Sequence, residues 1–265
     1  MPFTFDDLKS KTVVLTGAAW GIGRGLTGGL LDQGLNLVLI DRDAEQLARN
    51  TAALGCDKQV TCLHGDLADP DERARLASEI AEVAPSLWGI IHNAGIDPRR
   101  PLDRTDTDFM REVMATNVEP AVDLTRQLLP GLRADGGGRI ILIGSITFEI
   151  GTALLSAYVA SKGALVGLAR SLAHELGPDG ITVNCIEPGA IDVEKNAEQY
   201  TDETRRLVLA GQSLQRSLEP GDLLGLICLL LSDASQAISG QVIGVDGGCV
   251  HPWAAPSTQE HMVDE

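Results

Sequence analysis

A tyrosine and a lysine four positions apart, Tyr158 and Lys162, are the residues of this sequence best suited to proton transfer. They lie in a stretch with helical periodicity, so both side chains are expected on one face of a helix. A free phenol has a pKa near ~10 and is a poor base at neutral pH. An ammonium group beside it stabilises the phenolate and lowers that pKa. A tyrosine tuned in this way can exchange a proton with an alcohol or a ketone.

A serine at the end of a predicted strand, Ser145, precedes this pair. Its hydroxyl can hydrogen-bond a substrate oxygen and stabilise developing alkoxide charge. Tyr158 alone would also fit an exposed helical tyrosine. With the serine and the lysine present, the sequence predicts that Ser145, Tyr158 and Lys162 are catalytic, and that Ser145 and Tyr158 contact the substrate.

A glycine-rich loop near the N-terminus forms a second chemical motif. The first apolar run leads directly into Thr16-Gly17-Ala18-Ala19-Trp20-Gly21-Ile22-Gly23, and a helical pattern follows. Gly17 permits a tight turn, while Gly21 and Gly23 let the backbone approach a pyrophosphate and the helix pack on the sheet. The helix N-terminus then presents free N–H groups to phosphates. The motif predicts a dinucleotide site that includes Gly17, Trp20, Gly21, Ile22 and Gly23.

An aspartate at the end of the second predicted strand, Asp41, bears on the choice of dinucleotide. Its carboxylate can accept hydrogen bonds from the adenosine ribose hydroxyls and repels a 2′-phosphate. Arg42 follows it and can approach such a phosphate, and Asp41 could instead cap a turn or a helix. The charge of Asp41 favours NAD over NADP.

Short apolar runs alternate with helical segments along the chain, and these elements must position the motifs. The predicted strands are 12–16, 36–40, 59–63, 88–92, 139–143, 181–186 and 242–245, and the predicted helices include 43–54, 71–83, 106–129 and 153–176. Continuous apolar runs are typical of parallel strands buried on both faces. Repeated strand–helix units predict a doubly wound, Rossmann-like α/β sheet with helices on both faces.

The predicted organisation is a single catalytic domain over residues 1–250. The polar stretch 194–218 is expected to be a helical insertion, either a lid or a plain surface insertion. Residues 251–265 are expected to form a C-terminal tail.

The composition indicates an acidic globular protein. Lysine and arginine total 21 against 37 acidic residues, which gives a net charge of −16, and aromatic residues make up 3%. Such a surface disfavours nucleic acid and anionic membranes. The five cysteines include no CxxC pair, so we expect neither a zinc site nor a disulfide framework, and we expect a cytoplasmic location.

Further short motifs give the chain its family resemblance. Besides the residues above they are Asp66-Leu67, Asn93-Ala94-Gly95, Asn117, Pro188-Gly189 and the closing segment 240–248. In this order the chain resembles the classical short-chain dehydrogenases/reductases over residues 10–249. The resemblance implies a nicotinamide cofactor and a homotetramer or homodimer.

The resemblance also assigns roles. It implies that Asp66 and Leu67 border the adenine, that Asn93 and Gly95 line the cofactor cleft, and that Pro188, Gly189 and Ile191 pass the nicotinamide. It implies that Tyr158 and Lys162 also bind the cofactor, Lys162 at the nicotinamide ribose. It further implies that Asn117 belongs to the catalytic set and holds a water linking Lys162 to solvent. Two positions depart from the family pattern: His92 stands where Asn is usual, and Val193 stands where Thr is common.

The leading hypothesis is an NAD-dependent oxidoreductase that moves hydride between the nicotinamide and a secondary alcohol or ketone. A sugar or polyol is the first substrate considered, since Thr147 and Glu149 follow Ser145. One alternative is a 3-oxoacyl carrier-protein reductase, which Arg99 and Arg100 keep open although the net charge of −16 disfavours it. Another is a non-catalytic nucleotide-binding scaffold.

Overall fold

The computed structural model describes residues 4–55, 59–194 and 201–249. Within them, one parallel sheet has the strand order β3-β2-β1-β4-β5-β6-β7. Its strands are β1 (Thr12–Thr16), β2 (Asn36–Asp41), β3 (Val60–His64), β4 (Gly89–His92), β5 (Arg139–Ile143), β6 (Thr182–Pro188) and β7 (Val242–Val245). The doubly wound parallel sheet that the sequence predicts is confirmed.

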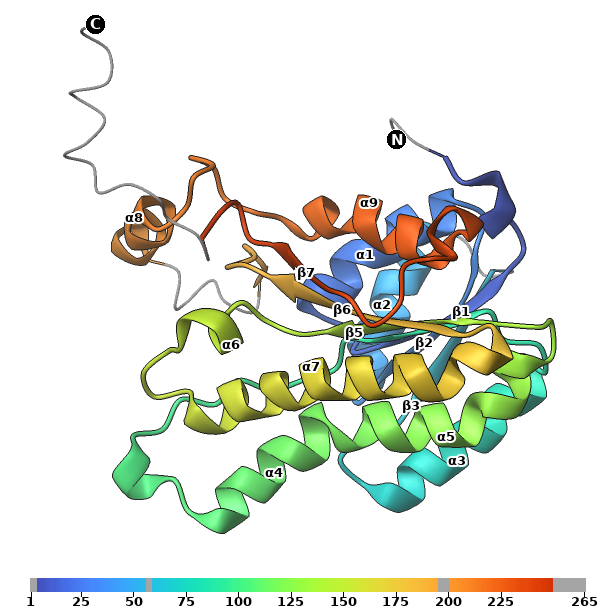
Figure 1. The fold of residues 1–265 in the computed structure, drawn as a ribbon, viewed down its shortest axis with the longest axis horizontal. Helices are drawn as coiled ribbons and strands as arrows, with labels where there is room; N and C mark the ends of the chain where they lie inside the picture. The colour runs from blue at the N-terminus through green and yellow to red at the C-terminus, as the bar shows by residue number, and fades with distance from the viewer. Residues whose placement is uncertain (1–3, 56–58, 195–200, 250–265) are drawn as a thin grey trace, which may run out of the picture.

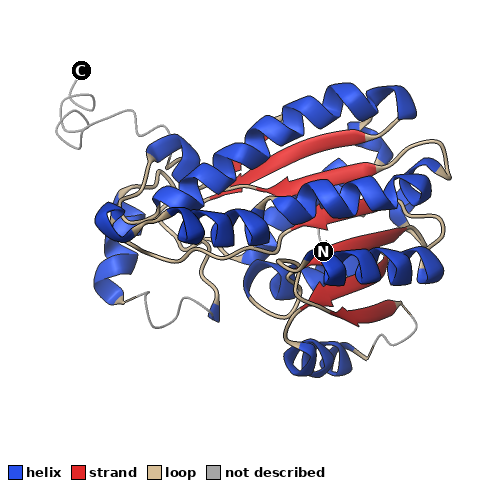
Figure 2. Cartoon of the chain, turned by 90° about the horizontal axis from the view of Figure 1, so that it is seen from below, coloured by secondary structure: helices blue, strands red, loops and turns tan. Residues whose placement is uncertain are grey.

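Helices cover both faces of this sheet (Figures 1 and 2). One face carries α1 (Gly21–Asp32), α2 (Ala44–Leu54) and α9 (Pro220–Leu231); the other carries α3 (Pro70–Val83), α4 (Thr107–Asn117), α5 (Glu119–Arg133) and α7 (Ser156–Leu176). Two apolar clusters fill the layers, one around Leu26 and Ile227 and one around Leu124 and Leu165. Each cluster also includes buried strand residues, which explains the continuous apolar runs.

Aspartates start several of the helices. The side chains of Asp43, Asp69 and Asp106 accept hydrogen bonds from backbone N–H groups in the first turns of α2, α3 and α4. These caps satisfy donors that the helix itself leaves unpaired.

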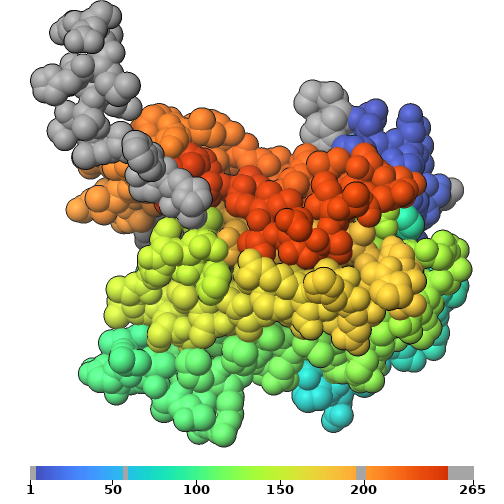
Figure 3. All heavy atoms as spheres, viewed as in Figure 1, coloured from blue at the N-terminus to red at the C-terminus, as the bar shows by residue number. Residues whose placement is uncertain are grey.

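Two short helices lie at the carboxyl ends of the strands. They are α6 (Thr147–Ile150) and α8 (Asp202–Ala210), and Figure 3 shows both regions at the same end of the molecule, with the segment around η2 (Leu102–Arg104) below them. The strand order reverses between β1 and β4, and ligands of open α/β sheets bind in the crevice at such a point. The fold therefore directs attention to the carboxyl ends of β1 and β4.

Some predicted elements are corrected by the structure. The single helix expected over 106–129 is two helices, because the backbone breaks between Asn117 and Glu119 and Pro120 begins a new first turn. The helix after the glycine loop starts at Gly21, and α6 was not predicted. Part of the insertion is helical as α8; residues 195–200 and the predicted tail lie outside the described residues.

Candidate active site

Ser145 and Tyr158 come together at the carboxyl end of β5. Ser145 is the second residue after this strand, and Tyr158 lies in the first turn of α7. The Ser145 side chain lies near enough to the Tyr158 hydroxyl to lower the pKa of the phenol. The Ser145 Oγ atom also accepts hydrogen bonds from the backbone N–H of Thr147 at 3.2 Å and from its hydroxyl at 2.9 Å. The serine hydroxyl is therefore held in place by Thr147 beside the phenol.

Lys162 lies one turn further along α7, and its ammonium group is buried. Its Nζ atom donates a hydrogen bond to the Ile143 carbonyl at 2.6 Å and lies 5.5 Å from the centre of the Tyr158 ring. Burial lowers the pKa of Lys162 to about 8. The lysine is thus hydrogen-bonded to the last residue of β5 and lies near the Tyr158 ring.

Burial also dominates the proton affinity of Tyr158. It raises the pKa of the phenol to about 12, the interaction with Ser145 lowers it, and the charge of Asp97 raises it. The net result is a raised pKa, and Lys162 is not among the groups that shift it in this structure. The physical reason is that burial destabilises the phenolate by more free energy than the interaction with Ser145 restores, while the Lys162 ammonium donates its hydrogen bond to the Ile143 carbonyl.

Asn117 connects three segments of the chain around this group. Its amide Nδ2 donates to the Ile96 carbonyl and to the Ser161 hydroxyl, each at 2.9 Å, and its Oδ1 accepts from the Ile96 N–H at 2.8 Å. Gly95 fits between Asn117 and Lys162, since an added Cβ would lie 3.3 Å from Asn117 Oδ1 and 3.7 Å from Lys162 Nζ. Asn117 thereby joins the loop after β4 to α7.

A cavity of about 540 Å³ opens beside this group, at the carboxyl ends of β1, β2 and β4. The predicted cofactor residues that line it are Gly17, Trp20, Gly21, Ile22, Asp41, Asp66, Leu67, Asn93 and Gly95. Six further residues predicted to bind the cofactor do not line it: Gly23, Tyr158, Lys162, Pro188, Gly189 and Ile191; Ser145 and Asn117 do not line it either. Residues that the sequence reasoning did not single out for the site also line it, among them Asp43, Asp97 and Thr116.

The glycine loop has the close backbone packing that a dinucleotide cradle needs. A Cβ on Gly23 would lie 2.1 Å from the Gly17 carbonyl oxygen, and Gly17 itself has a φ of +68°. The Asn93 side chain donates hydrogen bonds to the carbonyls of Thr16 and Gly17, each at 3.0 Å. Glycines and a side-chain brace therefore fix the loop at the start of α1, and the residues present fit a dinucleotide.

Two aspartates form the wall where the adenosine ribose would lie. Asp41 accepts hydrogen bonds from the N–H of Ala19 at 2.8 Å and of Asp43 at 3.0 Å, so it braces the loop as well as lining the cavity. The Trp20 indole donates to Asp43 Oδ2 at 3.0 Å. Asp43 could have been found from its position two residues after Asp41. Arg42 is exposed at the same cavity.

The two departures from the family pattern lie at different places. His92 is buried behind the site, where its Nε2 is 3.0 Å from the Thr125 hydroxyl and burial lowers its pKa to about 3. It is therefore a neutral structural residue. Val193 lines the cavity directly. Among the described residues, no group of three or more His, Cys, Asp or Glu could hold a metal ion, and no helix is long and apolar enough to cross a bilayer.

Comparison with known proteins agrees with this geometry. A family model described as enoyl-(acyl carrier protein) reductase matches residues 17–250. The D-xylose 1-dehydrogenase of Caulobacter vibrioides is 31% identical over 245 residues, covering 92% of this chain and 97% of that protein. The L-rhamnose 1-dehydrogenase (NADP(+)) of Thermoplasma acidophilum is 31% identical over 248 residues, covering 91% of this chain and 97% of that protein.

A solved structure shows the same similarity. The glucose/ribitol dehydrogenase of Brucella melitensis, a short-chain dehydrogenase/reductase, superimposes with a TM-score of 0.87 at 28% identity, covering 93% of this chain and 99% of that chain. The chain belongs to the short-chain dehydrogenase/reductase family. It is an oxidoreductase of the class that uses a nicotinamide cofactor.

Proposed function

We propose that the protein is an NAD-dependent dehydrogenase that oxidises a secondary alcohol, with a sugar as the first candidate substrate. It can also catalyse the reverse reaction, the reduction of the carbonyl product. The observation that carries this proposal is the grouping of Ser145, Tyr158, Lys162 and Asn117 behind Gly95 and Asp97, two residues that line a dinucleotide-sized cavity. The bound cofactor would supply the hydride acceptor or donor.

The side chains of the site would handle the proton. Ser145 would hydrogen-bond the substrate oxygen and stabilise its charge as the carbon–hydrogen bond breaks. Tyr158 would take the hydroxyl proton during oxidation and return it during reduction. Lys162 is charged below about pH 8, and its ammonium would stabilise the phenolate while contacting the nicotinamide ribose. We expect Asn117 to hold the water that passes the proton to solvent.

The preference for NAD rests on charge. Asp41 and Asp43 place two carboxylates at the ribose end of the cavity, where the 2′-phosphate of NADP would meet like charges. Trp20 adds no positive charge there. Arg42 is the one residue of this wall that favours NADP, and it is exposed to solvent, where its interactions are screened.

A hydroxyl-rich substrate fits the other end of the cavity. Asp97 lies close enough to Tyr158 and Lys162 for its charge to raise the pKa of both. A carboxylate beside the reacting group can accept hydrogen bonds from neighbouring hydroxyls of a sugar. The relatives named for D-xylose and L-rhamnose act on such substrates, which supports this class.

The carrier-protein reductase and the non-catalytic scaffold are supported less well. Arg100, a cation that would receive an acidic carrier, stacks on the Phe109 ring at 3.7 Å and donates to the Arg104 carbonyl. The net charge of −16 would repel such a partner. The assembled proton-transfer group argues against a scaffold that lacks activity.

The test is NADH formation by purified protein with NAD and a panel of aldoses, polyols and secondary alcohols, with NADP in parallel. Tyr158→Phe should lower kcat by about a hundredfold or more while the melting temperature stays the same. Turnover with NADP alone would contradict the role given to Asp41, and equal rates for Tyr158→Phe would contradict the mechanism. Light scattering would test the dimer or tetramer that the family relationship leads us to expect.

A further inference from the structure

The N-terminus of α1 carries an anionic side chain of the protein itself. The Gly21 N–H donates a hydrogen bond to Glu194 Oε1 at 2.8 Å, and Arg24 Nη1 lies 3.5 Å from the same oxygen. Gly21 is the first residue of α1 and lines the cofactor cavity. The Glu194 carboxylate lines an adjoining cavity and from there occupies the Gly21 N–H, a donor at the end of α1 where a pyrophosphate would bind.

The segment that carries Glu194 is anchored on the far side of the cavity. Asp192 pairs with Arg205 of α8 at 3.1 Å, and its N–H donates to the Leu218 carbonyl at 2.7 Å. Val193, between the two acids, lines the cofactor cavity and the adjoining cavity of about 340 Å³, which also includes Arg24 and Pro220. The contact of Glu194 with Gly21 thus joins the chain after β6 to the glycine loop.

We propose that Glu194 is an internal competitor of the cofactor pyrophosphate and thereby sets the cofactor affinity, an inference that rests on the dinucleotide site proposed above. The N–H groups at the N-terminus of α1 can bind either the carboxylate or the phosphates. Because both groups are negatively charged, each excludes the other from these donors. Binding then exchanges one hydrogen bond for another. Arg24 is released from Glu194 in the same step and becomes a cation available to the pyrophosphate.

The size of the effect follows from the bond that must be broken. The net contribution of a single hydrogen bond corresponds to roughly threefold to tenfold in a dissociation constant for a neutral acceptor, and to about tenfold or more for a charged one. The half-exposed position of Glu194 keeps the charge repulsion at the lower end of its range. We therefore expect removal of this carboxylate to tighten cofactor binding by about threefold to tenfold.

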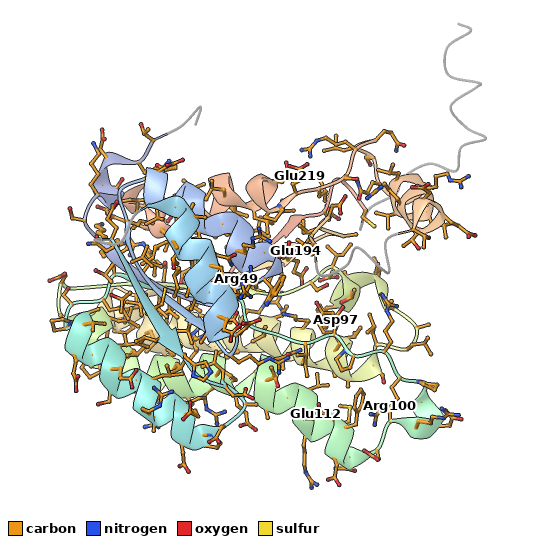
Figure 4. The ribbon with its side chains drawn as sticks, turned by 180° about the vertical axis from the view of Figure 1, so that it is seen from behind. Arg49, Asp97, Arg100, Glu112, Glu194 and Glu219 are labelled. Carbon is orange, nitrogen blue, oxygen red and sulfur yellow. The ribbon has the colours of Figure 1, made fainter. Side chains whose placement is uncertain are left out.

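The experiment is calorimetric titration of the Glu194→Gln and Glu194→Ala proteins with NAD, NADP and ADP-ribose. Both variants should show a lower Kd than the wild type for each compound, because all three contain the pyrophosphate. Glu112→Gln is the matched control: it removes the same charge from an exposed residue of α4, which packs on the opposite face of the sheet and lies far from Glu194 in Figure 4. It should leave each Kd unchanged.

The outcomes separate this inference from the function on which it rests. If the wild type binds ADP-ribose and both Glu194 variants bind it equally or more weakly, the competition is refuted while the dinucleotide site stands. If the wild type binds none of the three compounds, the dinucleotide site itself is overturned. ADP-ribose lacks the nicotinamide, so the result depends on neither hydride transfer nor the choice of substrate.

Discussion

Replacing Glu187 with glutamine should stabilise the protein, and more so as the pH rises. This glutamate lies near the end of β6, is 4% exposed, and its Oε1 atom has no hydrogen-bond partner among the described residues. Gly144, which follows the neighbouring strand β5, leaves room for it, since a Cβ there would lie 3.2 Å from Glu187 Cγ. Burial, with smaller effects of Glu149 and Asp246, raises the pKa of Glu187 from 4.5 to about 7, although the charge of Arg170 lowers it.

The magnitude follows from this difference in pKa. Between about pH 4.5 and 7 the folded protein binds a proton that the unfolded chain has already released, so the free energy of unfolding falls as the pH rises through this range. Each pH unit of difference is worth ~1.4 kcal/mol. At about pH 8 the ionised carboxylate therefore costs the folded state on the order of 3 kcal/mol, and near pH 4.5 it costs almost nothing.

Urea unfolding of the wild type and of Glu187→Gln measures this directly, at one protein concentration and at both pH values. We expect a gain of about 2 to 3 kcal/mol at about pH 8, reduced somewhat by the buried amide, and little gain near pH 4.5. Glu112→Gln should change neither value. An equal gain at both pH values would refute the reasoning, because the cost would then come from shape and not from charge.

Two further predictions concern catalysis and the glycine loop. The rate of alcohol oxidation should rise with pH from about 7 and rise less steeply above about 8. The reason is that Tyr158, with its pKa of about 12, acts as a base only when ionised, and that Lys162 loses its charge near pH 8. Stopped-flow kinetics would measure this dependence, and a flat profile between pH 7 and 8 would contradict it. Gly23→Ala should abolish NAD binding in calorimetry, because its Cβ would lie 2.1 Å from the Gly17 carbonyl oxygen, whereas Gly28→Ala on the same helix meets only Leu54 at 3.7 Å and should bind NAD normally.

The sequence predicts the sheet well because the signals for it are local. The apolar runs mark every strand to within two residues, and the spacing of Gly17, Gly21 and Gly23 marks the turn into α1. The break at Asn117 also had a local signal in Pro120, which the helical periodicity of the surrounding residues concealed.

Properties that depend on burial or on distant contacts could not be predicted in the same way. The raised pKa of Tyr158 reflects the packing around it, which the spacing to Lys162 does not reveal. The contact of Glu194 with Gly21 joins residues 173 positions apart. Glu187 is the one charged residue of β6, and its environment is set by α6, α7 and the residue after β7.

The hydrogen bonds of Asn117 have a consequence for any effort to alter this enzyme. One amide fixes the loop after β4 and the start of α7, and the same amide faces the buried ammonium across Gly95. In the proposed mechanism, the packing of the site and the proton transfer therefore depend on the same side chain. Substitutions there will change stability and turnover together, so laboratory evolution of a new specificity should leave Asn117 fixed and vary the residues around Asp97.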